Sequence, residues 1–423
     1  MELGRKYLPR IADDQLSEAL KTSGAVQIKG PKWCGKTATG ERHSKSQLYL
    51  QDPDKSADLL ALADAKPSLL LEGEAPRLID EWQMAPQLWD AVRFAVDHSS
   101  ARGRFILTGS STPSVQPAHS GVGRISSLTM RTMSLFEAGD SSGSVSLSSL
   151  FDQETAVAAI SDLEIDDLAF VLCRGGWPEA VTEVDSKLAL RYAFNYVDGL
   201  IDSDVSRIDD VSRNATRMRF LMRSYARNVS SRASIETIRE DMQEDKASLS
   251  STTIVDYLDA LSRSYVIEDL AAWNPALRSK TAVRTSPTRH FTDPSIAVAT
   301  LRISPEKLLQ DFETFGLLFE SLCVHDLRVY AGAIDGDVFQ YRDKTDLETD
   351  AVVTLRDGRW AAIEVKLGSR QIDEGARHLI ALEQRVDSKK MGKPSFLMVL
   401  TGTKSAYRRD DGVLVVPLGC LKP

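Results

Sequence analysis

Short apolar runs alternate with helix-compatible stretches along the first part of the chain. GAVQIKG (24–30), PRLIDEWQ (76–83) and RFILTGSS (104–111) each hold a few consecutive apolar residues. QLWDAVRFAVDHSS (87–100) instead repeats its apolar residues at helical spacing. Strands that alternate with helices favour a parallel sheet covered by helices. We therefore predict an α/β domain over residues 1–140.

The pattern becomes helical after AGDSSGSVSLSS (138–149), whose serines and glycines are typical of a loop or linker. We interpret residues 150–210 as a helical lid. Over residues 215–305, three short helical patterns precede two strand-like runs, and Ser234 is a candidate helix N-cap. Three helices followed by a hairpin are typical of a winged helix, a variant of the helix-turn-helix.

The pattern changes once more over residues 310–423. FETFGLLFESLCVHDLRVYA (312–331) predicts a helix, and the runs after it predict a small mixed sheet with another helix. The chain as a whole is thus predicted to be an α/β protein of four parts.

Composition narrows the class of protein. Of the 423 residues, 42% are hydrophobic and 26% charged, which is typical of a soluble globular protein. The net charge of −8 argues against non-specific coating of nucleic acid, although a local basic patch stays possible. The four cysteines are scattered without a CxxC pair, which favours neither zinc nor disulfides. With no secretory signal and no apolar run of membrane-spanning length, we expect a cytoplasmic protein that contacts no membrane.

The first candidate site is the segment GPKWCGKTA (30–38), which follows an apolar strand. Its spacing fits the phosphate-binding P-loop, in which glycines let the backbone wrap around phosphate oxygens. The pattern predicts that Lys36 reaches the β- and γ-phosphates of a nucleotide and that the hydroxyl of Thr37 holds Mg²⁺. The whole predicted nucleotide-binding segment comprises Gly30, Pro31, Lys32, Trp33, Cys34, Gly35, Lys36, Thr37 and Ala38.

Two further apolar strands end in polar residues that suit the same site. RLIDEWQ places Asp80 and Glu81 at a strand end, where Asp80 can complete the shell of Mg²⁺ and Glu81 can polarise an attacking water. The alternative is a pair of acids that only face solvent. FILTGSS ends in polar residues, one of which could orient water against the γ-phosphate, or the segment is an ordinary strand-to-turn transition.

GPKWCGKT, LIDEWQ, FILTGSS, GVGRI and RGGWPEA together resemble the segments of a bacterial and archaeal family of AAA+-type ATP-binding proteins. Members of that family carry a C-terminal domain of long-unknown function, and the resemblance covers nearly the whole chain. It implies ATP and Mg²⁺ as cofactors, Asp80 as metal ligand and Glu81 as general base. It also implies that Ser110 occupies the polar sensor position.

Two arginines lie in the remaining segments of this resemblance. Arg124, in GVGRI, matches a family arginine and could act as an arginine finger in cis or on a neighbouring subunit of a homo-oligomer. The alternative is that it only caps a helix or pairs with an acid. Arg174, in RGGWPEA, is a weaker candidate for a phosphate contact and could merely pack beside the glycine turn.

A second constellation lies in LETDAVVTL and RWAAIEVKLG. Glu364 and Lys366 are two residues apart on one strand and so share a face, and the turn RDGR brings Asp350 alongside. Two carboxylates could share a divalent metal while the lysine positions or activates a water, which suits phosphodiester cleavage. The alternative is an exposed polar face in which Glu364 and Lys366 form an ion pair.

This constellation resembles the restriction-endonuclease-like PD-(D/E)XK fold. The resemblance implies Glu320 as a further acid at a tentative second metal site with Asp350 and Glu364, and Gln371 stands at a spacing some active members use. The sequence departs from that pattern because ETD replaces the proline-aspartate pair, so the domain is either an active nuclease or a degenerate domain that binds nucleic acid or a protein partner.

The winged-helix segment leaves its partner open as well. Ile254, Leu258 and Leu261 recur at helical spacing and are predicted to be core. The same helix offers few side chains for base edges, whereas basic residues of the predicted wing could meet phosphates of DNA. These are Arg278, Lys280, Arg284 and Arg289. The alternative is a winged helix that packs against protein.

We therefore predict an ATP-binding protein, and an enzyme that hydrolyses ATP with Mg²⁺. Its nucleotide state would control C-terminal domains that bind or cleave DNA. The rival hypotheses are a nucleotide-dependent regulatory switch that binds a protein partner through an inactive nuclease-like domain, and a binding module whose P-loop no longer turns over.

Overall fold

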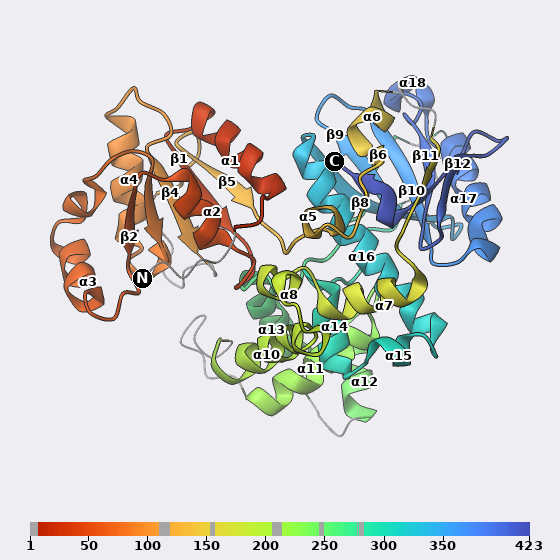
Figure 1. The fold of residues 1–423 in the computed structure, drawn as a ribbon, viewed down its shortest axis with the longest axis horizontal. Coiled ribbons are helices and arrows are strands. Elements are labelled where there is room, and N and C mark those ends of the chain that lie inside the picture. The colour runs from red at the N-terminus through yellow and green to blue at the C-terminus, as the bar shows by residue number, and fades with distance from the viewer. Residues whose placement is uncertain are drawn as a thin grey trace. The chain divides into compact units, whose positions relative to one another are not determined.

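The structure is a computed structural model that describes residues 7–109, 119–152, 157–204, 214–244, 249–276, 278 and 283–423. The chain divides into two compact units (Figure 1). The first comprises Met1–Thr132, Leu200–Asn214 and Asp259–Val266, and the second comprises Met133–Gly199, Ala215–Leu258 and Ile267–Pro423.

A five-stranded parallel sheet forms the centre of the first unit, with strand order β2-β3-β4-β1-β5. Its strands are β1 (Ala25–Lys29), β2 (Ser46–Tyr49), β3 (Arg77–Asp80), β4 (Phe105–Gly109) and β5 (Ile125–Thr129). The helices of this unit include α1 (Ile11–Thr22), α2 (Lys36–His43), α3 (Ser56–Ala65) and α4 (Gln87–Asp97). The predicted parallel α/β domain is confirmed.

Alternate residues of each strand are buried on opposite faces of this sheet, as the period of two requires. Phe105 and Leu107 of β4 pack with residues of α3 and α4. Ile106 lies in the other cluster, together with Leu16 of α1. Gly40 lets α2 approach that face, since a Cβ at this position would lie 2.8 Å from Leu78 Cδ1.

Helices make up the N-terminal half of the second unit. They are α5 (Leu135–Ala138), α6 (Leu147–Phe151), α7 (Ile165–Arg174), α8 (Pro178–Thr182), α9 (Ser186–Ala189), α10 (Arg191–Gly199), α11 (Ala215–Arg227), α12 (Ile235–Glu244), α13 (Ser251–Arg263), α14 (Pro294–Leu301) and α15 (Pro305–Leu308). The last five residues of α13, from Asp259 to Arg263, are an exception, because they fall in the first unit. Helix α14 is apolar and buried on most of its surface, and it contacts α7, α10 and α11.

The C-terminal part of the second unit is a mixed sheet of seven strands in the order β7-β12-β13-β11-β10-β9-β8. Its long strands are β8 (Gly336–Arg342), β9 (Glu348–Leu355) and β10 (Trp360–Lys366), which form an antiparallel meander. Helix α16 (Phe312–Ala333) precedes the meander and α17 (Ile372–Arg385) follows it. The remaining elements are α18 (Ser388–Met391), β7 (Ala159–Ile160), β11 (Leu397–Thr401), β12 (Ser405–Arg408) and β13 (Leu414–Pro417).

The serine-rich stretch at 138–149 is not a linker. Its short strand β6 (Val145–Ser146) pairs with β14 (Leu421–Lys422) at the C-terminus. Ser141 Oγ donates to the carbonyl of Leu421 at 2.7 Å, and Ser146 Oγ donates to that of Pro423 at 2.8 Å. The small polar residues predict a loop because a local pattern gives no sign of partners that lie far away in the sequence.

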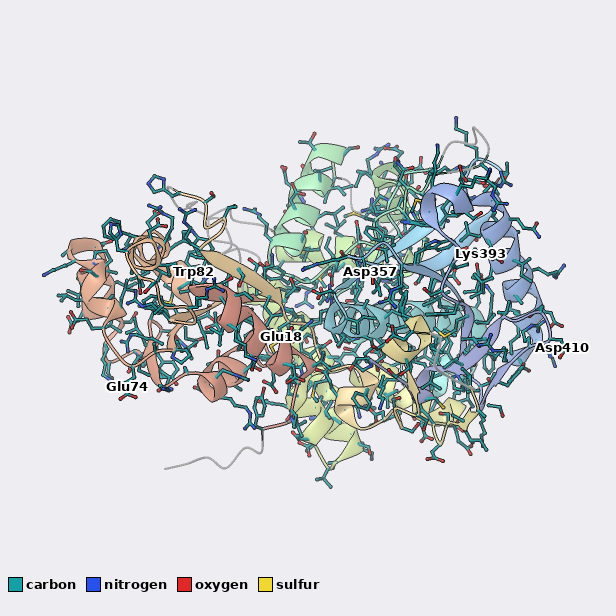
Figure 2. All side chains as sticks on the ribbon, turned by 90° about the horizontal axis from the view of Figure 1, so that it is seen from above. Glu18, Glu74, Trp82, Asp357, Lys393 and Asp410 are labelled. Atoms are coloured by element: carbon teal, nitrogen blue, oxygen red, sulfur yellow. The ribbon has the colours of Figure 1, made fainter. Side chains whose placement is uncertain are left out.

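Charged side chains such as those of Glu74 and Asp357 lie on the surface, whereas Trp82 is buried in the first unit (Figure 2). Among the described residues, no helix combines the length and the apolar character that crossing a membrane requires.

Candidate nucleotide-binding site

The loop between β1 and α2 has the backbone that its glycines permit. Gly30 has φ +153°, and a Cβ there would lie 1.9 Å from the carbonyl oxygen of Met130 on the neighbouring strand segment. Gly35 is left-handed, with φ +101°, at the N-cap of α2. Pro31 and Cys34 are buried, while Lys32, Trp33 and Ala38 are exposed. The loop therefore turns back on itself at the carboxyl edge of the sheet, and α2 begins at the end of this turn.

Lys36 lies inside this loop. Its Nζ donates hydrogen bonds to the carbonyl oxygens of Gly30 at 2.9 Å and Pro31 at 2.7 Å, and the side chain is buried. The loop's own backbone thus satisfies an ammonium group that would otherwise need anionic oxygens.

Asp80, at the end of β3, is the centre of a polar cluster beside the loop. Its side chain is 1% exposed, and Oδ1 accepts a hydrogen bond from Thr37 Oγ1 at 2.9 Å. Thr108 Oγ1 donates to the same oxygen, and Gln51 Nε2 donates to Oδ2 at 2.6 Å. The structure therefore brings together Thr37 and Asp80, which lie 43 positions apart in the sequence.

Glu81 follows in a strained conformation. Its φ of +56° lies in the left-handed region, which costs a residue with a side chain about 1–2 kcal/mol. Gln83 Nε2 donates a hydrogen bond to Oε2 of Glu81. The carboxylate predicted as general base is thus held by an amide that sequence reasoning did not single out.

Arg10, which lies outside the loop motif, also contacts the loop. Its Nη1 donates to the carbonyl of Cys34 at 2.7 Å, and its Nη2 donates to that of Arg131 at 2.9 Å. Cys34 is a free, buried cysteine that packs in the core and whose Sγ contacts the carbonyl of Met130 at 3.5 Å. No local pattern around Arg10 marks this contact, because its partners lie 24 and 121 positions away.

The structure does not bring Arg124 to this site. The residue immediately precedes β5, at the edge of the sheet opposite the loop, since β1 and β5 run parallel from Ala25 and Ile125. Five strand residues separate the two edges by roughly 16 Å. Arg124 Nε instead pairs with Asp97 Oδ1 at 2.6 Å. Ser110, the predicted sensor, lies outside the described residues.

Arg174 belongs to the second unit and ends α7. Its Nη2 pairs with Asp140 Oδ2 at 2.6 Å and its Nε donates to the carbonyl of Gly175 at 3.1 Å. These contacts agree with the packing alternative for the RGGWPEA segment.

The C-terminal constellation assembles on neighbouring strands of the second unit. Lys366 Nζ lies 3.1 Å from Glu364 Oε2 and 4.0 Å from Asp350 Oδ2, and the amide of Val365 donates to Asp350 Oδ2 at 2.7 Å. Glu364 is almost fully buried, and within the described part of the chain its Oε1 has no hydrogen-bond partner. His378 Nδ1 lies 3.9 Å from that oxygen.

Burial and mutual repulsion disfavour charge on these acids. Burial raises the pKa of Glu364 well above its ordinary value, and Asp350 adds to the effect. Burial also raises the pKa of Glu320 on α16 and that of Asp350, although Lys366 opposes both shifts. Burial alone would lower the pKa of Lys366, but Asp350 and Glu364 raise it above its usual range. Lys366 is therefore a cation beside carboxyl groups whose ionised forms are disfavoured.

The tentative second metal site of Glu320, Asp350 and Glu364 stays a prediction. Among the described residues, no group of three or more histidine, cysteine, aspartate and glutamate side chains is arranged to hold a metal ion. The ammonium of Lys366 takes up Glu364 Oε2, and the backbone takes up Asp350 Oδ2. Gln371 is exposed at the N-terminus of α17.

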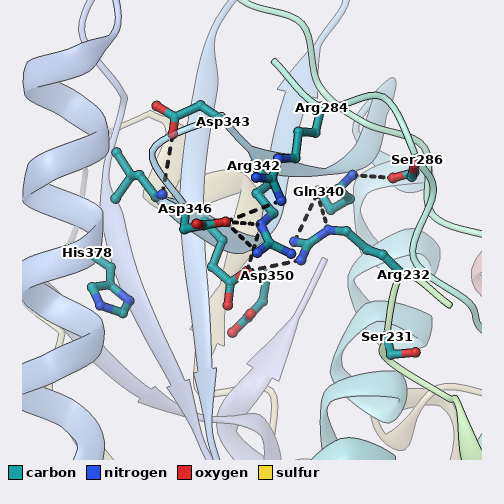
Figure 3. Close-up of polar contacts among 12 residues, drawn as sticks. Ser231, Arg232, Arg284, Ser286, Gln340, Arg342, Asp343, Asp346, Asp350 and His378 are labelled. Carbon is teal, nitrogen blue, oxygen red and sulfur yellow. Dashed lines mark hydrogen bonds and ion pairs between the residues drawn. The ribbon is translucent and has the colours of Figure 1, made fainter. Parts of the chain in front are cut away.

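A polar network joins this sheet to the predicted winged-helix segment (Figure 3). Arg232 donates to Gln340 Oε1 from Nη2 at 3.2 Å and pairs with Glu348 Oε2 at 3.0 Å. Arg284 pairs with Asp346 at 3.2 Å. Gln340 Nε2 donates to the carbonyl of Ser286 at 3.0 Å.

The predicted wing forms backbone hydrogen bonds with β8, the edge strand of the seven-stranded sheet. The amide of Trp273 donates to the carbonyl of Gln340 at 2.6 Å, and that of Arg284 donates to the carbonyl of Arg342 at 2.9 Å. The wing arginines are engaged within the protein: Arg278 with Ser388, Arg284 with Asp346 and Arg289 with Asp269. Lys280 lies outside the described residues. Ile254, Leu258 and Leu261 are buried, which confirms the predicted core stripe.

Three family models match separate parts of the chain. Residues 22–138 match an AAA domain. Residues 165–307 match a domain of unknown function (DUF8612), and residues 315–421 match another (DUF4143).

The chain is also similar to two curated proteins and one solved structure. It is 25% identical over 361 residues to uncharacterized protein Rv2008c of Mycobacterium tuberculosis and equally to uncharacterized protein Mb2031c of Mycobacterium bovis, covering 84% of this chain and 73% of each relative. A Walker-type ATPase of Pyrococcus abyssi, PABY2304, aligns with a TM-score of 0.43 and 15% identity over 70% of this chain and 96% of that one. The AAA match, the parallel sheet and the loop after β1 support a P-loop NTPase domain in the N-terminal part of the chain.

Proposed function

We propose that the chain binds ATP at the loop of residues 30–37 and hydrolyses it with Mg²⁺. The observation that carries the proposal is the 2.9 Å hydrogen bond between the Thr37 hydroxyl and the buried Asp80 carboxylate, beside a loop that encloses the Lys36 ammonium. A hydroxyl and a carboxylate are the hard oxygen ligands that Mg²⁺ prefers.

Each residue has a role that follows from its chemistry. Lys36 exchanges its two carbonyl partners for phosphate oxygens, which are stronger acceptors because they carry charge. Thr37 and Asp80 would hold Mg²⁺, which when bound neutralises charge on the phosphates. Glu81 accepts the proton of the attacking water. Arg10 keeps the loop against the end of β5 while these exchanges occur.

Phosphate release and calorimetry with ATP test this proposal on the full-length protein. We expect Lys36→Ala to abolish ATP binding, because the loop loses the cation that offsets the phosphate charge. We expect Glu81→Gln to keep binding and to lower turnover by about 10²-fold or more, because the amide cannot accept the proton. Lys45→Ala, exposed and outside the loop, is the matched control and should behave like wild type.

The outcomes separate the rival hypotheses. Tight ATP binding without turnover in the wild type would leave the hypothesis of a binding module whose P-loop no longer turns over. No binding of ATP that depends on Lys36 would overturn the proposal altogether.

We further propose that nucleotide state controls the C-terminal unit. The order α16, β8–β10, α17 and β11 supports a restriction-endonuclease-like core, and α11–α13 with the wing supports a winged helix. One observation favours the regulatory switch over a nuclease: the wing arginines Arg284 and Arg289 are paired with acids within the protein. Incubation with plasmid and Mn²⁺, beside Lys366→Ala, should give no cleavage that depends on Lys366; such cleavage would restore the nuclease hypothesis.

Limited proteolysis tests the control itself. The Glu81→Gln protein with ATP should give a cleavage pattern different from that of the same protein without ATP, since ATP would favour one arrangement of the C-terminal unit. Identical patterns would argue against nucleotide control.

A further inference from the structure

Gln83 connects the predicted general base to the end of the neighbouring strand. It lies in the 3₁₀ turn Trp82–Met84 that follows β3, and its Nε2 donates a hydrogen bond to Glu81 Oε2. The turn is closed by the amide of Met84, which donates to the carbonyl of Glu81 at 2.9 Å. The left-handed backbone of Glu81 and the amide of Gln83 together set the direction of the carboxylate.

The other end of the same amide lies against Gly109, the last residue of β4. Gln83 Oε1 is buried and has no hydrogen-bond partner among the residues that the structure describes. A Cβ added at Gly109 would lie 2.4 Å from this oxygen and 3.3 Å from Trp82 Nε1, which is also buried without a partner. The absence of a side chain at position 109 therefore makes room for the amide.

The orientation of this amide follows from its neighbours. Turning it over would place Oε1 against Oε2 of Glu81, so that two acceptors would face each other. Leaving Oε1 without a partner costs about 1–3 kcal/mol. The molecule accepts this cost and keeps the N–H directed at the carboxylate.

We propose that Gln83 is a positioning residue that orients Glu81 for ATP hydrolysis, seated in the space that Gly109 leaves open. This role rests on the proposed ATPase function. It adds a third residue to the segment IDEWQ, in which Asp80 and Glu81 were the predicted pair.

Steady-state phosphate release by full-length Gln83→Ala tests the role. We expect kcat to fall by about tenfold or more, within the range that a positioned general base supplies. ATP affinity measured by calorimetry should stay near the wild-type value, because the amide of Gln83 donates to Glu81 and not to a residue of the loop. Gln87→Ala is the matched control, since Gln87 Nε2 also donates to a carboxylate, Asp64 Oδ1 at 2.6 Å, but away from the loop.

Two combinations distinguish positioning from a purely structural role. In a Glu81→Gln background, Gln83→Ala should lower kcat no further, because its effect passes through Glu81. Gly109→Ala should lower kcat in the wild type by displacing the amide, and it should have a smaller effect once Gln83 is alanine. This second variant retains Gln83, so it tests the role even if Gln83→Ala folds poorly.

The results separate this role from the function it rests on. A wild-type protein that releases no phosphate would overturn both. Wild-type turnover with unchanged kcat in Gln83→Ala, or additive losses in the combinations, would overturn the role of Gln83 alone.

Discussion

At the scale of single residues, the phosphate-binding loop depends on side chains outside its motif. Gly30 and Gly35 permit the backbone conformation, but Arg10 holds the carbonyl of Cys34 in place from another element. Arg10 is buried and bridges the loop to Arg131, just past the end of β5. The motif therefore supplies the shape of the loop, and the tertiary contact supplies its rigidity.

The contribution of Arg10 can be measured as stability. Arg10→Met keeps much of the apolar stem but leaves the carbonyls of Cys34 and Arg131 without these charged donors. We expect the free energy of unfolding to fall by ~3 kcal/mol, since each buried unsatisfied group costs about 1–3 kcal/mol. Urea unfolding measures the change.

The control for this substitution is Arg102→Met. Arg102 is exposed and donates to one carbonyl, that of Lys21, at 3.3 Å. We expect a loss of about 0.5 kcal/mol or less. Equal losses in both variants would contradict a bracing role for Arg10.

At the scale of elements, the hairpin β9–β10 and the helix α16 carry acids whose protonation is coupled to folding. The pKa values of Glu320, Asp350 and Glu364 are raised, with burial as the largest cause. A raised pKa means that the folded state binds more protons than the unfolded state, so stability decreases as pH rises above the ordinary carboxyl range. Lys366 has a raised pKa, so it stays charged throughout this window and adds no slope.

Glu364→Gln should therefore flatten the dependence of stability on pH. Between pH 5 and pH 8 we expect the wild type to lose about 1 kcal/mol or more that the variant retains. Urea unfolding at both pH values measures the difference. Glu374→Gln, exposed on α17, should leave the wild-type slope unchanged. A Glu364→Gln slope equal to that of the wild type would show that Glu364 ionises freely in the folded state.

The wing is a second case at this scale. Its bridges Ala272↔Gln340 and Val283↔Asp343 extend the sheet past β8. The arginines that a DNA-binding wing would direct outward instead pair with Asp346 and Asp269. Both ion pairs lie within the second unit.

At the scale of the whole molecule, the place of Arg124 bears on assembly. It lies at the sheet edge opposite the loop, 48% exposed, and pairs with Asp97. If it serves as an arginine finger, it serves the site of a neighbouring subunit. We propose such a homo-oligomer.

Mixing two inactive variants tests this assembly. Lys36→Ala and Arg124→Ala should each lack ATPase activity alone, and an equimolar mixture should recover about a quarter of the wild-type rate. Half of the sites keep the lysine, and half of those face an intact arginine. Full activity of Arg124→Ala alone would show that Arg124 takes no part in hydrolysis and only forms its surface ion pair with Asp97. An inactive mixture would contradict action in trans.

The sequence by itself determined the local features of this protein. The parallel α/β domain, the loop at Lys36 and the core stripe of α13 follow from patterns within one or two neighbouring elements. Such patterns are readable because strand alternation, helical spacing and glycine-dependent turns act over a few residues. The shared face of Glu364 and Lys366 follows from the same period of two.

Only the tertiary structure decided which distant residues meet. It pairs the serine-rich segment with the C-terminus and places Lys366 against Glu364. It also places Arg124 at the edge of the sheet opposite the loop, where it pairs with Asp97. It also brought Gln83 between Glu81 and Gly109. These contacts depend on strand order and on burial, which no local pattern encodes, because each side chain's partner is chosen by packing over the whole unit.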